Sequence, residues 1–177
     1  LKTVVATEGF WQSSYGGPTS SDVNPAFYDL VPDLRYDSRV TIGALDSSGD
    51  PFPSNELGSI GIDFTNFENG GAISANNGTW YVLPIDVQGE AQPIITDACT
   101  VGYGVLIGRL TAYGHTSEVT GEALFQGRNA LDVTWQATGG STATLGNGAD
   151  CNSNGVPDEC EADCDNDGVP DDCEIFD

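Results

Sequence analysis

Two stretches near the carboxyl end of the chain carry oxygen-bearing side chains at spacings that suit a metal ion. One begins at Asp150 and the other at Asp163, and each follows the twelve-residue pattern D-x-[DN]-x-[DN]-G-x5-E. Position 7 of such a loop contributes a backbone carbonyl, so an apolar side chain is tolerated there. The predicted metal ligands are Asp150, Asn152, Asn154, Val156, Asp158, Glu161, Asp163, Asp165, Asp167, Val169, Asp171 and Glu174.

The chemistry of these two loops points to calcium. Ca²⁺ takes roughly six to eight hard oxygen ligands, and the closing glutamate contributes both of its oxygens. Gly155 and Gly168 occupy the sixth position of each loop, where the chain must turn sharply and glycine accepts positive φ. We therefore predict two Ca²⁺ sites. The alternative is a plain acidic tail, because a run of carboxylates is usually just solvated.

The spacing between the loops excludes a paired EF-hand. Only Ala162 separates Glu161 from Asp163, which leaves no room for a helix, and Pro157 and Pro170 also disfavour one. The stretch, about 25 of the 177 residues, resembles the thrombospondin type 3 calcium repeats and is less similar to dockerin modules. That resemblance implies repeats that wrap calcium ions with little other core, stapled by disulfides between neighbouring turns.

The cysteines of the tail predict disulfides and an oxidising compartment. Their spacings, C-x8-C, C-x3-C and C-x8-C, fit zinc patterns poorly. We expect disulfides within the tail, with the pairing left open; the residues concerned are Cys151, Cys160, Cys164 and Cys173. The favoured interpretation of Cys99 is a buried free thiol, with a bridge to the tail or to another chain as the alternative.

The charge of the chain restricts its partners. The net charge is -22, with 27 acidic and only 5 basic residues, and 11 of the acids lie in residues 150–177. Nucleic acid needs clustered lysine and arginine, so we expect none to bind. No stretch approaches the ~20 apolar residues of a membrane span, so we expect no membrane insertion. Leu1 is interpreted as a processed or trimmed end, which together with the cysteines predicts an extracellular or cell-surface location.

The remainder of the chain is predicted to be all-β, an antiparallel β-sandwich or jelly roll over residues 1–137. A linker at 138–149 then leads into the calcium repeats at 150–177. We expect a hairpin turn at Asn77-Gly78 and bulges or close backbone approaches at glycines 102, 104 and 108. The expected strands are residues 1–7, 39–45, 59–64, 79–85, 100–113, 118–127 and 131–137.

No set of residues in this body assigns an enzymatic reaction, and we predict that the protein is not an enzyme. His115 is the only histidine. A glycosidase pair among Asp63, Glu68, Asp86 and Glu122 stays a nominal alternative, since only folded spacing reveals one. The possible ligand-binding residues are aromatic: Trp11, Tyr15 and Trp80. Trp80 and Tyr81 should point to opposite faces of their strand, one into the core and one outward.

These observations predict a secreted calcium-binding structural protein, a subunit of an extracellular or cell-surface assembly. The expected partner is another copy of the chain, in an oligomer or a filament built by tail docking or strand addition. Residues 1–7 are expected to form an edge strand of their own sheet, with insertion into the next subunit as the alternative. The competing hypothesis is a carbohydrate-binding or adhesion module on a calcium-rigidified stalk. The body also resembles secreted β-rich modules of bacterial surface proteins, on the texture of YDSRVTIGALDSSGD and NNGTWYV.

Overall fold

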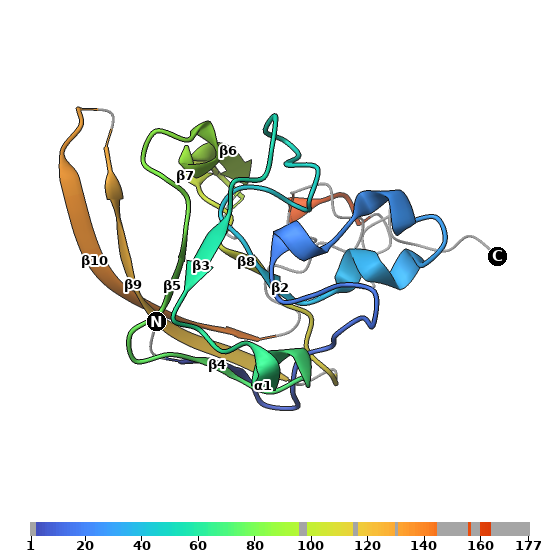
Figure 1. The fold of residues 1–177 in the computed structure, drawn as a ribbon. Helices are drawn as coiled ribbons and strands as arrows, with labels where there is room; N and C mark the ends of the chain where they lie inside the picture. The colour runs from blue at the N-terminus through green and yellow to red at the C-terminus, as the bar shows by residue number, and fades with distance from the viewer. Residues whose placement is uncertain are drawn as a thin grey trace. The chain divides into compact units, whose positions relative to one another are not determined.

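The computed structural model describes residues 3–95, 99–114, 117–129, 131–144, 156 and 160–163. These residues form mostly β-strands in several small antiparallel sheets, with few and short helices, which confirms the all-β class (Figure 1). The chain divides into two compact units. The first consists of Leu1–Glu90 and Val105–Ala143, and the second of Ala91–Gly104 and Thr144–Asp177.

The main sheet of the first unit has four strands in the order β10-β9-β1-β4. Strand β1 pairs antiparallel with β9, Val5 opposite Thr120, and on its other side with β4, Val4 opposite Ile73. The chain's first strand is therefore an interior strand, and our expectation of an edge strand is wrong. Figure 1 shows β9 and β10 as a long curved hairpin. The bounds are β1 Thr3–Ala6, β4 Ile73–Ser74, β9 Glu118–Arg128 and β10 Thr134–Thr144.

Three two-stranded sheets complete the described strands. In the first unit β2 (Arg39–Val40) pairs with β8 (Gly108–Arg109). In the same unit β3 (Gly58–Ile60) pairs with β5 (Thr79–Tyr81). In the second unit β6 (Gln92–Ile95) pairs with β7 (Val101–Gly104).

The helical elements are each a turn or so long and lie in the first unit. Proline begins two of them, where its fixed φ suits the first helical residue and its missing N–H is not needed. The elements are α1 Thr65–Glu68, η1 Ser20–Asp22, η2 Pro25–Phe27, η3 Pro32–Tyr36 and η4 Val87–Gly89.

The strand expected at 100–113 is divided between the units. Its first part, β7, pairs with β6 in the second unit, and its later part, β8, pairs with β2 in the first. The close approach expected at Gly108 is present, since a Cβ there would lie 3.3 Å from the carbonyl oxygen of Arg39. A Cβ at this position would require the facing backbone of β2 to give by a few tenths of an ångström.

The hairpin expected at Asn77-Gly78 is not formed. The strand before it, β4, pairs with β1, and the strand after it, β5, pairs with β3. Gly78 instead packs directly on the backbone of Gly61, and a Cβ at either glycine would collide with the other segment. Gly78 thus allows two chain segments to approach each other closely. A rule for local turns does not take such a long-range contact into account.

The core of the first unit is small and centred on aromatic rings. Phe10 and Phe67 are fully buried and meet edge to face, with ring centroids 5.4 Å apart. Ala6 from β1, Val40 from β2 and Ile73 from β4 surround them. The core therefore joins the main sheet to the β2–β8 pair and to α1.

Candidate functional site

The predicted calcium loops are described only in part. Val156, Glu161 and Asp163 belong to the described residues, and Glu161 and Asp163 are both partly buried. Among the described residues, no group of three or more His, Cys, Asp or Glu side chains is close enough to hold a metal ion. The predicted ligands outside the described residues are Asp150, Asn152, Asn154, Asp158, Asp165, Asp167, Val169, Asp171 and Glu174.

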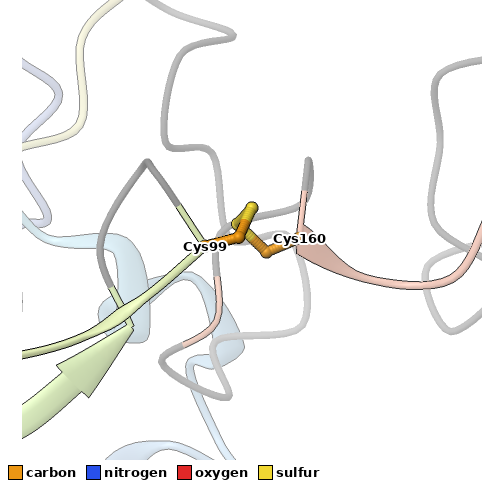
Figure 2. Close-up of a disulfide and its surroundings, with 2 residues drawn as sticks. All are labelled: Cys99 and Cys160. Atoms are coloured by element: carbon orange, nitrogen blue, oxygen red, sulfur yellow. A yellow bond between two sulfur atoms is a disulfide. The ribbon is translucent and has the colours of Figure 1, made fainter.

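A disulfide joins Cys99 to Cys160 within the second unit (Figure 2). The two Cα atoms are 5.4 Å apart, although the residues are 61 positions apart in the sequence. Our expectation that Cys99 is a free buried thiol is therefore wrong, and the alternative of a bridge to the tail is confirmed. Cys160, which we expected to pair within the tail, pairs with Cys99 instead. Cys151, Cys164 and Cys173, for which we expected disulfides within the tail, lie outside the described residues.

The position of this disulfide ties the first predicted calcium loop to the β6–β7 hairpin. Cys99 lies just before β7 and has the left-handed backbone conformation, with φ of 54°. Cys160 immediately precedes Glu161, the twelfth residue of the loop. The disulfide therefore holds the backbone directly before Glu161.

A buried polar cluster, which we did not anticipate, organises the loops of the first unit. The carboxylate of Asp37 accepts hydrogen bonds from the backbone N–H of Ser13, at 2.6 Å, and of Gly17, at 3.0 Å. Arg39 is 2 % exposed, and it donates from Nε to the carbonyl of Leu45 and from a terminal nitrogen to the carbonyl of Asp37. The one signal in the sequence is that Arg39 is one of only five bases.

Burial sets the ionisation of this cluster. It raises the pKa of Asp37, an effect opposed by the two backbone hydrogen bonds and by the charge of Arg39. It lowers the pKa of Arg39, because the guanidinium is removed from water. It also raises the pKa of Tyr28, whose hydroxyl donates to Asp46 at 3.1 Å. The charges are used to hold loop backbone in place, a structural role.

The three possible ligand-binding aromatics occupy different environments. Trp80 packs against the core, and its indole N–H donates to the carbonyl of Thr41 at 3.0 Å. Tyr81 is exposed, which confirms the expected division of faces between the two. Trp11 is half-buried, whereas Tyr15 is 64 % exposed in a loop anchored by Asp37. Tyr15 is therefore the most accessible of the three side chains.

The nominal glycosidase acids lie in or beside α1, η4 and β9. Asp63 lies just before α1 and accepts a hydrogen bond from the backbone N–H of Thr65 at 3.0 Å. Hydrogen bonds from the side chain and the backbone of Thr65 lower the pKa of its exposed carboxyl. Glu68 lies in α1 and Glu122 in β9. His115 lies outside the described residues.

Comparisons with known proteins gave no match: no family model, curated protein or solved structure is significantly similar to the chain. No helix in the described part of the chain is long and apolar enough to cross a membrane.

Proposed function

We propose that this protein is a secreted, calcium-binding structural protein and a subunit of an extracellular or cell-surface assembly. A β-sandwich or jelly-roll body would carry two Ca²⁺ ions in a tail at residues 150–177. Copies would associate through that tail once its charge is neutralised. The observation that carries this proposal is the tandem, complete repetition of the twelve-residue oxygen-ligand pattern.

The charge distribution supports a cation as the tail's partner. Residues 150–177 hold 11 carboxylates and no lysine or arginine. Carboxylates brought close together repel, and a divalent cation between them removes that repulsion and supplies a centre around which the chain can order. Few apolar residues are available there to do the same.

The Cys99–Cys160 disulfide supports the first of the two sites in particular. It fixes the backbone one residue before Glu161, the predicted bidentate ligand. Fixing one end of a flexible loop reduces the conformational entropy that is lost when the loop closes on an ion. A disulfide also suits the secreted location that we propose.

Calorimetric titration of the full chain, after removal of metal with EDTA, tests the proposal. We expect two Ca²⁺ ions per chain. Because the closing glutamate completes the oxygen shell, Glu161→Gln and Glu174→Gln should each remove or strongly weaken one site. Glu56→Gln is the matched control, since Glu56 is an exposed acid of the first unit and loses the same charge. Absence of binding, or equal loss in the control, would refute the calcium sites.

The assembly role is tested by electron microscopy and light scattering of the same protein. Particles or filaments should form with calcium and dissolve with EDTA. If the protein remains monomeric in calcium at all accessible concentrations, the proposed role as a subunit of an assembly is wrong, even where calcium binding is found.

The second candidate is a carbohydrate-binding or adhesion module, favoured by the exposed ring of Tyr15 and by half-buried Trp11 four residues earlier in the sequence. Aromatic rings in accessible loops provide stacking surfaces for sugars. A glycan array with wild type, Trp11→Ala and Tyr15→Ala separates the two candidates. Glycan binding that both substitutions abolish, in a protein that stays monomeric, would favour the module.

A further inference from the structure

The outer edge of β10 is a long strand edge in the first unit. Strand β10 is 11 residues long and lies at the end of the sheet, with β9 as its neighbour. On the other side, no described strand pairs with it. Figure 1 shows this hairpin reaching beyond β4, the short strand at the opposite end of the same sheet. A strand edge of this kind presents backbone N–H and C=O groups in a row.

The hairpin connection determines which of these groups point outward. The N–H of Asn129 donates to the carbonyl of Val133 at 3.0 Å, so these two residues face each other across the ladder. In an antiparallel ladder, alternate residues bond to the same neighbour. The backbone groups of Thr134, Gln136 and Thr138 therefore point away from β9. Asp132, with φ of 62°, supplies the left-handed residue that such a short connection needs.

Natural proteins usually protect such an edge with charges, proline or a bulge. Residues 134–144, TWQATGGSTAT, contain no charged residue and no proline, in a chain with 27 acidic residues. Residues 134–138 are all exposed, and Trp135 is 47 % exposed with its ring over Gly127 of β9. The strand is therefore accessible and unprotected over the same residues whose backbone groups point outward.

We propose that the outer edge of β10 pairs antiparallel with the same edge of a second copy of this chain, centred near Gln136. The outward N–H and C=O groups of each copy would then bond to those of the other, and the two four-stranded sheets would become one continuous sheet. Such a contact is isologous, with the same surface on both copies. The biological use of this pairing rests on the proposed role in an assembly, but the pairing itself requires no calcium.

Charge identifies the second copy as the occupant. Two chains of net charge -22 repel each other overall, and an uncharged strand is a place where that repulsion is weaker and they can approach. A basic peptide would have no acidic side chain within β10 to recognise. The small surface of one strand pair predicts weak and reversible association, which salt should strengthen by screening the repulsion between the remaining acids.

Sedimentation equilibrium of the full chain in EDTA tests the pairing separately from calcium. We expect a reversible dimer whose fraction rises with protein concentration and with salt. Hydrogen exchange of the amides in 134–138 should slow as the dimer forms. Gln136→Pro removes an outward N–H but no bond to β9, and Gln136→Lys places like charges opposite each other in the dimer. Each substitution should therefore raise the dissociation constant of the dimer at least 10-fold.

Ser14→Lys is the matched control, because it adds the same charge in an exposed loop and should leave the dimer intact. Circular dichroism establishes that each variant is folded, and exchange in the wild type remains decisive if a variant is not. A wild type that stays monomeric in EDTA, or exchange at 134–138 that does not depend on concentration, overturns the proposal. Slowed exchange at 134–138 that appears only when a different protein is added also overturns it. Calcium binding without this dimer would leave the calcium proposal standing and remove only this one.

Discussion

The first unit and the tail differ in what holds them together. The first unit has an aromatic core around Phe10 and Phe67 and a buried polar cluster around Asp37 and Arg39. The tail has almost no apolar residues, a dense set of carboxylates and a covalent tie through Cys160. Burial of apolar surface and satisfied hydrogen bonds need no ligand, whereas repelling carboxylates need a cation. Under the proposed function, one chain combines a ligand-independent part with a ligand-dependent one.

Removal of calcium should produce the largest effect, and it should change the tail while leaving the first unit unchanged. In EDTA we expect cleavage within residues 150–177 by a protease to become at least 10-fold faster, because the ordering free energy comes from the metal. The first unit should keep its resistance and its thermal transition. Mass spectrometry of the fragments with time measures both. Equal protection of the tail with and without metal would contradict the proposed dependence.

Phe67→Ala should produce the next largest effect, in the first unit. The side chain is fully buried against Phe10, and its truncation should lower the free energy of unfolding by about 3–5 kcal/mol. Calcium affinity should stay as in wild type, since the proposed sites lie in the other unit. Urea unfolding and calorimetry make the two measurements. The exposed Phe27 provides the control, because Phe27→Ala should change stability little.

Loss of the disulfide should affect the second unit by about 2–4 kcal/mol, the usual contribution of such a cross-link. Cys99→Ser together with Cys160→Ser leaves the predicted oxygen ligands in place but frees the backbone beside Glu161. We expect weaker calcium binding at one of the two sites and unchanged unfolding of the first unit. If both calcium affinities remain those of the wild type, the disulfide does not position the loop.

The smallest effect is the pH dependence that Asp37 contributes to the first unit. Burial raises its pKa above the ordinary value of 3.8, so its contribution to stability is present below that value. The contribution is lost as pH rises through the raised pKa. The unfolding free energy of wild type minus that of Asp37→Asn should therefore fall with increasing pH over this range. Urea unfolding at several pH values measures it, and a difference that rises with pH would contradict the assignment.

Sequence patterns predicted the coarse fold because strand signals are local. The segments at Thr3–Ala6, Thr79–Tyr81 and Glu118–Arg128 are rich in β-branched or aromatic residues and bounded by turn residues, and all became strands. They did not predict that β10 would continue to Thr144, because glycine and small residues at 138–144 are typical of a linker as well. Pairing with β9 is what makes that segment a strand.

The candidate site shows the same division. Local spacing was enough to propose two oxygen cages, since all ligands of one cage lie within twelve residues. The partner of Cys99 could not be predicted, because 61 positions separate it from Cys160 and five cysteines allow many pairings. Only the fold brings the start of β7 to the residue before Glu161.

The sequence by itself determined the acidity of the chain, its β-rich texture and the doubled ligand pattern, because each depends on residues close together in the chain. The tertiary structure alone decided that β1 is an interior strand, that Gly78 packs against Gly61, and that β10 is an edge among the described strands. These outcomes join segments that are far apart in sequence. They depend on which contacts are favourable enough to offset the entropy lost when long loops close, and no local pattern carries that information.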